Sequence, residues 1–229
     1  MKGRLTKYKT KLNALLLTAF ATVCTLLVAL TNLWTAPIIE EQKRLDVLNK
    51  LKQVLVESKF DNNPLNNCVV ITDKTITGVD SPVTLYRATF NEVPYAVVFQ
   101  TRTQQGYNGL IELMVAVDVN GQVQGVRTLT HQETPGLGDK IELAKSDWIL
   151  SFNNKRVKDK DDSRWFVKKD GGDFDQFTGA TITPRAIVNQ LRTSIDELNG
   201  QFNTLFQASN DCQLPETDDA ELTSEVAHD

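Results

Sequence analysis

The chain has 229 residues, of which 41% are hydrophobic and 24% charged, so it can form one or two domains that bury a core. Its net charge is −4, and the first eleven residues carry five positive charges, which leaves −9 for the remainder. An acidic chain without a basic stripe speaks against a nucleic-acid partner. The two histidines and three cysteines form no CxxC motif and no Cys/His cluster, which argues against c-type haem, iron–sulfur and structural zinc sites.

The first predicted element is a membrane-spanning helix over 12–36, because no charged residue occurs from Leu12 to Ile39. A bilayer core needs about 20 apolar residues, and threonines in such a helix can bond to carbonyls one turn earlier. The basic segment 1–11 precedes the run, so the N-terminus should stay in the cytoplasm and the rest should be exported. A cleavable signal peptide is the alternative. Its apolar core would be shorter, and Trp34 stands where a small residue would be needed.

An amphipathic helix is predicted next, within 37–60. It would pack its apolar stripe on the exported domain or on a partner. The stripe consists of apolar residues at helical spacing: Leu45, Leu48, Leu51, Val54 and Leu55.

The segment 61–208 is predicted to be one α+β domain, an antiparallel sheet flanked by helices. The expected strands are 68–72, 83–90, 95–101, 110–119 and 123–129. The expected helices are 138–145, 148–152 and 185–198. Turn signals at Glu92-Val93-Pro94 and Asn120-Gly121 separate strands, and the second is typical of a two-residue hairpin. The last helix should begin with Thr183 as N-cap and Pro184 in its first turn, and end with Asn199-Gly200.

The end of the chain, 209–229, carries seven acidic residues from Asp211 onward and no lysine or arginine. We expect this acidic tail to be disordered. Cys68 and Cys212 lie in the exported part, where they either form a disulfide or remain two unpaired thiols.

The segment Thr178-Gly179-Ala180-Thr181 precedes the last helix and combines small residues with hydroxyl groups. Glycine lets a bulky ligand approach the backbone, and free N–H groups at a helix start favour a phosphate. The alternative is an ordinary turn. Two other segments could complete a pocket, 106–109 and 131–138, although each alone is better explained as a hairpin and a connecting loop.

The order of these motifs along the chain resembles the G subunit family of the Rnf (Rsx) electron transport complex. The related C subunit of the sodium-translocating NADH:quinone reductase shares the same FMN-binding domain, and the likeness extends over about 2–203. The motifs that carry it are the anchor, Gly106-Tyr107-Asn108-Gly109, Glu133-Thr134-Pro135-Gly136-Leu137-Gly138 and Asp175-Gln176-Phe177-Thr178-Gly179-Ala180-Thr181.

The resemblance implies that Thr181 carries FMN through a phosphoester, attached by a flavin transferase of the ApbE type that takes FMN from FAD with magnesium. It assigns no catalytic residue and no metal ligand to this chain. It assigns Asp175 to the signature that the transferase reads, and the remaining residues to the flavin site. Those residues are Thr178, Gly179 and Ala180 in the attachment loop, and Glu133, Thr134 and Leu137 beside the isoalloxazine ring. We interpret His131 as a polar loop residue and Trp148, Phe152 and Trp165 as core.

The implied protein is a single-pass inner-membrane subunit with a periplasmic flavin domain, which relays electrons among the redox centres of a larger complex. Such complexes couple electron transfer between ferredoxin and NAD(H) to ion movement, and in some bacteria keep an iron–sulfur sensor reduced. Independent turnover is not expected. The alternatives are the C subunit of the quinone reductase, a stand-alone periplasmic flavin reductase, and an anchored binding module in which Thr181 is never modified.

Overall fold

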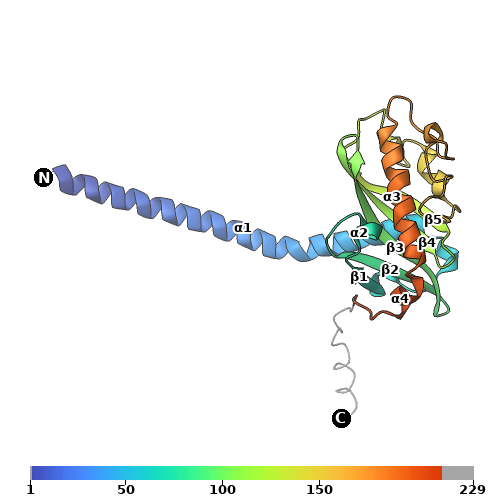
Figure 1. Ribbon diagram of the computed structural model, residues 1–229. Helices are drawn as coiled ribbons and strands as arrows, with labels where there is room; N and C mark the ends of the chain where they lie inside the picture. Colours follow the sequence, from blue (N-terminus) through green and yellow to red (C-terminus); the bar gives the residue numbers. More distant parts are fainter. Residues whose placement is uncertain (1, 213–229) are drawn as a thin grey trace, which may run out of the picture. The chain divides into compact units, whose positions relative to one another are not determined.

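The computed structural model describes residues 2–212 and places one long N-terminal helix before an α+β domain (Figure 1). The chain divides into two units between Leu48 and Asn49. The acidic tail is expected over 209–229. Its part from residue 213 onward lies outside the described residues.

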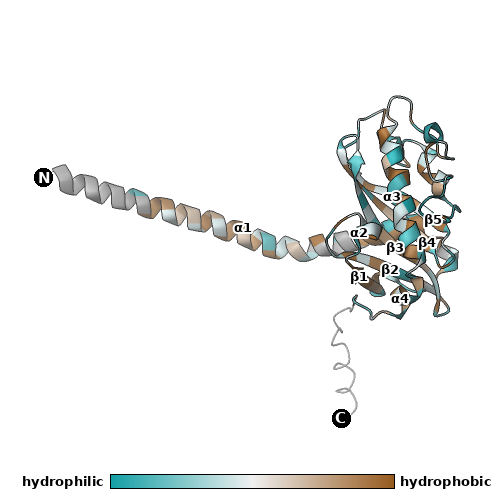
Figure 2. Cartoon of the chain, viewed as in Figure 1, coloured by the Kyte–Doolittle hydropathy of each residue, from teal (hydrophilic) through white to brown (hydrophobic). Residues whose placement is uncertain are grey.

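Helix α1 runs from Lys2 to Val54, so the predicted spanning segment and the predicted amphipathic helix belong to one element. Its stretch Leu15–Pro37 has a mean hydropathy of 2.0 (Figure 2), and among the described residues it alone is long and apolar enough to cross a membrane. The expected back-bonding is present at Thr35, which donates to the carbonyl of Thr31 at 2.9 Å, and at three earlier threonines. Their hydroxyls each donate to a carbonyl at 2.8 Å: Thr22 to Thr18, Thr25 to Ala21 and Thr31 to Leu27.

The domain is built on a five-stranded antiparallel sheet in which each strand pairs with the next along the chain. All five predicted strands are present, which confirms the α+β architecture. The strands are β1 (Cys68–Ile71), β2 (Val83–Phe90), β3 (Val93–Gly106), β4 (Gly109–Asp118) and β5 (Val123–His131).

Two predicted turns differ in detail from the structure. The β2–β3 turn is formed by Asn91 and Glu92, both with positive φ, so Val93 already belongs to β3. The β4–β5 connection is longer than the predicted two-residue hairpin, and in it Gly121 has a φ of 78°. The cause is Asp118, whose Oδ1 accepts backbone N–H groups from residues 120 and 122 at 2.9 Å and holds a wider loop.

Helix α3 (Ile182–Asn199) crosses one face of the sheet, as Figure 1 shows, and contains the last predicted helix. The two other predicted helices are wrong in type: 3₁₀ turns stand there at Asp139–Ile141 and Asp147–Phe152. These turns are held by i→i+3 backbone hydrogen bonds. The packing of their buried side chains determines this conformation more strongly than the helical periodicity of the sequence does. The short helices α2 (Lys74–Thr77) and α4 (Phe202–Gln207) were not predicted, because one or two turns give no readable periodicity.

The sheet is buried on both faces. Residues such as Val97 and Phe99 share a core with α3. On the opposite face, a Cβ built on Gly125 would lie 2.6 Å from the carbonyl oxygen of Val54, so the end of α1 passes directly over β5. Leu51 and Val54 are 1% exposed there, which confirms that the end of the amphipathic stripe packs on the domain.

A disulfide between Cys68 and Cys212, with a Cα–Cα distance of 5.2 Å, decides between the two alternatives left open for these cysteines. The backbone N–H of Asp211 donates to the carbonyl of Cys68 at 3.0 Å, so the end of the described chain lies along β1. Beside it, the buried guanidinium of Arg87 donates to the carbonyls of Leu205 and Ala208 at 3.0 and 2.8 Å. The C-terminal segment is therefore an integral part of the domain.

Candidate functional site

Three segments that are distant in the sequence enclose a cleft of about 280 Å³. They are the tip of the β3–β4 hairpin, the loop that follows β5, and the turn that leads into α3. The lining residues are Tyr107, Glu133, Thr134, Leu137, Gly138, Gly179, Ala180, Thr181, Ile182 and Thr183. Six of the predicted flavin-site residues are therefore together in one cleft, and Asp175 and Thr178 are outside its lining.

The turn before α3 owes its shape to Gly179. The backbone N–H of Ala180 donates to the carbonyl of Phe177 at 3.1 Å, and Gly179 has a φ of 81°. Positive φ at the third position is typical of a type II turn and requires a residue that tolerates it. A Cβ built on Gly179 would come no closer than 3.8 Å to Leu137, so the space above the glycine is open.

Thr181 directly precedes α3 and already has helical dihedral angles, with φ −67° and ψ −27°. The prediction that Thr183 is the N-cap is therefore wrong, because the turn delivers the chain into helical geometry two residues earlier. Pro184 lies in the first turn as predicted. The first N–H groups of a helix have no carbonyl partner within it, and they attract an anion. The half-buried Thr181 stands at this end of the helix.

The Glu133 carboxylate joins the three walls of the cleft. Its Oε1 accepts the backbone N–H of Asn108 at 3.1 Å, and its Oε2 accepts the hydroxyl of Thr183 in a short hydrogen bond. The side chain is 5% exposed and the Thr183 residue 0%. Sequence reasoning placed Glu133 beside a flavin ring and missed Thr183. The only signal was a second threonine two residues after Thr181.

His131 is the last residue of β5, forms its side-chain hydrogen bonds with the segment that follows, and does not line the cleft. Its Nδ1 accepts the backbone N–H of Glu133 at 3.0 Å, and its Nε2 lies 2.8 Å from Oε1 of Glu142. Both ring nitrogens therefore form hydrogen bonds to the segment after β5, which agrees with the polar role predicted for this residue.

Asp175 and Thr178 lie next to the cleft on the outer surface. The Asp175 carboxylate pairs with Lys168 at 2.6 Å and its side chain is 69% exposed. Its backbone carbonyl accepts the indole N–H of Trp148 at 2.8 Å. Thr178 is exposed at the tip of the turn. Both side chains are thus accessible to another protein without entering the cleft.

A cluster of aromatic side chains supports the turn from beneath. The Trp148 ring meets Phe177 edge to face at 5.1 Å, and Phe152 stacks on Phe174 at 4.5 Å. Trp165 is 1% exposed within the same cluster. The predicted packing role of these aromatic residues is confirmed. Because Phe177 belongs to the cluster and is also the first residue of the turn, the cluster holds the start of the turn in place.

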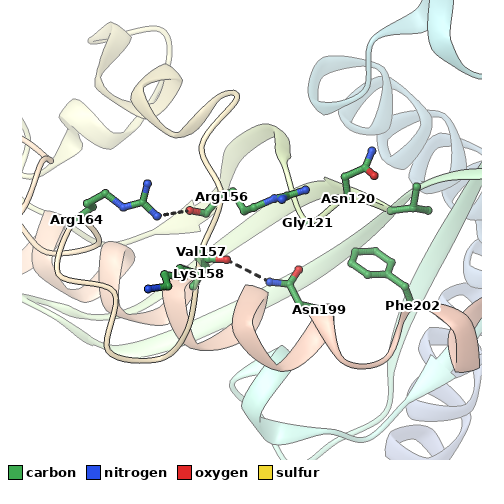
Figure 3. A pocket seen from close by; sticks show the side chains of 9 residues that line it. Asn120, Gly121, Arg156, Val157, Lys158, Arg164, Asn199 and Phe202 are labelled. Atoms are coloured by element: carbon green, nitrogen blue, oxygen red, sulfur yellow. Dashed lines mark hydrogen bonds between the residues drawn. The ribbon is translucent and has the colours of Figure 1, made fainter.

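A second pocket, of about 490 Å³, is basic and contains none of the predicted site residues (Figure 3). Arg156, Lys158 and Arg164 line it near the C-terminal end of α3, where Asn199 donates to the carbonyl of Val157 at 3.5 Å. Arg164 is paired with Asp162 at 2.6 Å. In the described part of the chain, no group of three or more His, Cys, Asp or Glu residues could hold a metal ion.

Two family models match the chain: the FMN-binding domain over residues 106–196 and the RnfG N-terminal region over residues 1–54. The first of these ranges contains all three walls of the cleft. The second covers α1, including the apolar stretch.

Several curated relatives are named as the G subunit of an ion-translocating oxidoreductase complex. The protein from Shewanella loihica is 45% identical over 202 residues, which is 88% of this chain and 95% of that protein. The Shewanella amazonensis protein is 50% identical and covers 80% of this chain and 85% of its own length. The Vibrio cholerae protein is 43% identical, and the match covers 88% of this chain and 96% of that protein.

Among solved structures, the chain is similar to the C subunit of the Na(+)-translocating NADH-quinone reductase from Parabacteroides distasonis. The TM-score is 0.43 at 16% sequence identity, with 74% of this chain and 96% of that chain covered.

Proposed function

This chain belongs to the G subunit family of ion-translocating oxidoreductase complexes, and from that membership we propose that it carries FMN in a phosphoester bond to Thr181. The observation that carries the proposal is the position of this threonine. Its residue lines the cleft, directly at the N-terminal end of α3. The FMN-binding domain match supports the cofactor, and the geometry supports the point of attachment.

The residues of the cleft fit the two halves of FMN. The start of α3 offers backbone donors and the positive end of a helix to a phosphate. Tyr107, Leu137 and Ile182 surround the cleft with apolar side chains that are 65%, 45% and 46% exposed, as a flat ring system at the surface requires. Glu133 is the one carboxylate in the lining, and both of its oxygens are hydrogen-bonded to the protein.

The attachment is a phosphoryl transfer from FAD. The Oγ1 of Thr181 forms a bond to the flavin phosphate, the pyrophosphate bond of FAD breaks, AMP leaves, and the hydroxyl proton is lost. No electrons are exchanged. The exposed Asp175 supports recognition of the turn by a flavin transferase of the ApbE type, working with magnesium, because it lies beside the cleft and outside its lining. Thr181 is then a point of attachment and not a catalytic residue.

We propose that the chain is an uncleaved single-pass protein of the inner membrane with its N-terminus in the cytoplasm. The basic residues before the apolar stretch support this orientation. The Cys68–Cys212 disulfide supports a periplasmic domain, since such bonds persist in oxidising compartments. The proposed divisions are 1–11 cytoplasmic, 12–36 spanning, 37–60 juxtamembrane, 61–212 flavin domain and 213–229 acidic tail. The domain end predicted at residue 208 moves to Cys212, because 210–212 are hydrogen-bonded and disulfide-bonded to β1.

Within the complex, we propose an electron relay without independent turnover. Bound flavin supplies redox chemistry at the cleft. The chain's own groups support positioning and not acid–base catalysis, because the Glu133 carboxylate is buried and its oxygens are engaged by Asn108 and Thr183. The partners are the other subunits. Purified flavinylated protein should show no steady-state oxidation of NADH without them, and such turnover would favour a stand-alone reductase.

The attachment is tested by co-expression with the transferase, followed by a denaturing gel viewed under ultraviolet light. Wild type should give a fluorescent band that is lost in Thr181→Ala. Thr193→Ala is the matched control, since it removes a threonine hydroxyl on the exposed face of α3, outside the cleft, and should keep the band. A dark wild-type band, or fluorescence that persists in Thr181→Ala, would refute the proposal.

A further inference from the structure

We propose that Glu133 and Thr183 form a positioning pair for flavin attachment. Their buried hydrogen bond holds the first turn of α3 against the loop after β5, so that the hydroxyl of Thr181 is presented in the cleft. The inference rests on the proposed attachment at Thr181. The pair acts through the backbone and not on the reacting atoms.

Thr183 is close to the attachment point. Thr183 lies in the first turn of α3, two residues after Thr181, and helical geometry relates their backbones rigidly. The Thr183 hydroxyl is inside the protein, where it donates to Glu133 Oε2. Fixing this hydroxyl therefore fixes where the preceding residues of the turn lie.

The Glu133 side chain is itself held in place by hydrogen bonds. Its other oxygen, Oε1, accepts the backbone N–H of Asn108 at 3.1 Å, and the Asn108 side chain donates to the carbonyl of Gln132 at 2.7 Å. The Glu133 backbone N–H donates to His131 at 3.0 Å. The carboxylate thus connects the β3–β4 hairpin, the loop after β5 and α3, which are the three walls of the cleft.

Backbone packs closely around the Glu133 carboxylate. A Cβ built on Gly106 would lie 2.7 Å from Oε1 of Glu133. A Cβ built on Gly138 would lie 2.9 Å from Oε2 and 3.1 Å from the Thr183 hydroxyl. The Gly106 Cβ would also lie 2.5 Å from the carbonyl oxygen of Gly109, so that glycine serves the hairpin as well, whereas at Gly138 all three nearest atoms belong to Glu133 and Thr183. An incidental polar contact would not need such accommodation.

The fold does not depend on this bond alone. Arg185, also in the first turns of α3, forms an ion pair with Asp170 at 2.6 Å and a second hydrogen bond at 2.9 Å. Ile187 and Leu191 of α3 share the core with the sheet, and Pro184 is also buried. We therefore expect α3 to form when the Thr183 hydroxyl is removed, with the attachment turn less precisely placed.

The test is the rate of FMN transfer from FAD to the purified full chain, with the chain as varied substrate of the transferase. Thr183→Val removes the hydroxyl at nearly constant volume. We expect kcat to fall at least tenfold with KM changed less than twofold, because Asp175 and the outer surface of the turn are untouched. Thr183→Ser restores a hydroxyl and should return kcat to within threefold of wild type.

The matched control is Thr193→Val, a change of the same kind on the exposed face of α3, where the hydroxyl donates to Asn189 at 3.0 Å. It should leave kcat and KM unchanged. Folding of each variant is checked by thermal unfolding and by formation of the Cys68–Cys212 disulfide on a non-reducing gel. If Thr183→Val does not fold, Thr183→Ala takes its place with the same expectation.

Several results would overturn the inference: an unchanged kcat in Thr183→Val, a rise in KM alone, or a serine variant that fails to recover. Failure of both Thr183→Val and Thr183→Ala to fold would also overturn it, because the hydrogen bond would then be needed for folding itself. In each of these cases wild type is still flavinylated at Thr181. Failure of the proposed function is a separate result, in which wild type itself is not labelled.

Discussion

Replacing Gly125 by alanine tests whether the end of α1 is an integral part of the domain. A Cβ at this position would lie 2.6 Å from the carbonyl oxygen of Val54, 2.8 Å from its Cα and 3.1 Å from its carbonyl carbon. All three are backbone atoms, which cannot turn aside as a flexible side chain can. The helix end must therefore shift outward by about 1 Å to reach ordinary contact distance.

The cost can be bounded from the structure. Overpacking a well-packed site costs about 1–3 kcal/mol, which is the effect we expect for Gly125→Ala on the free energy of unfolding. The upper limit is complete undocking of Leu51, Val54 and Leu55, which are 1%, 1% and 5% exposed. At about 1.5–3 kcal/mol for each buried side chain, that limit is roughly 5–9 kcal/mol. The loss of stability in Gly125→Leu should be closer to this upper limit than the loss in Gly125→Ala.

The assay is urea unfolding of the detergent-solubilised chain, followed by the fluorescence of the core residues Trp148 and Trp165. Gly200→Ala is the matched control, because its Cβ would come no closer than 3.7 Å to another atom and its φ is −78°. The control should change stability by less than about 0.5 kcal/mol. Equal stability of Gly125→Ala and the control would show that α1 does not pack on β5.

Three further changes test other features of the domain. Cys212→Ser opens a disulfide loop with a sequence separation of 144, so we expect a loss of about 2–5 kcal/mol by denaturant unfolding and no further effect of reductant. Hydrogen bonds from Arg164 lower the pKa of Asp162, so this carboxylate stabilises the fold above pH ~4 and the benefit is lost as pH falls through its lowered pKa. The Tm difference between wild type and Asp162→Asn should therefore be largest near neutrality and disappear in acid. Gly138→Ala places a Cβ against the buried carboxylate of the cleft and should reduce flavin fluorescence on a denaturing gel severalfold.

The strands could be predicted because each is a short run rich in apolar and β-branched residues, bounded by turn signals, and some of them alternate at period two. The turns between them were less predictable. Asn91 and Glu92 form the β2–β3 turn in preference to the segment containing Pro94, which pairs with Thr89 in the sheet. At 138–145 the sequence pattern suggested a helix, whereas buried side chains set a 3₁₀ turn. Tertiary packing decided these cases, and no local pattern encodes it.

The candidate site was predictable as a set of motifs and not as a geometry. Small residues before a helix pointed to Thr181, and motif order linked it to Glu133 and Leu137. The contact of Glu133 with Thr183 could not be read from the sequence, because it depends on α3 starting at Ile182. A start two residues later would have made Thr183 a capping residue at the surface.

The Cys68–Cys212 bond closes nearly the whole α+β domain into a covalent ring, with Thr181 inside it. A protease that cuts one peptide bond within the ring, such as in the exposed segment 158–161, would release no fragment. The piece bearing Thr181 would stay joined to β1 and, through it, to α1. If Thr181 carries FMN as proposed, release of the flavin-bearing piece would require both a cut and a reductant, so the ring would protect the cofactor from loss by proteolysis.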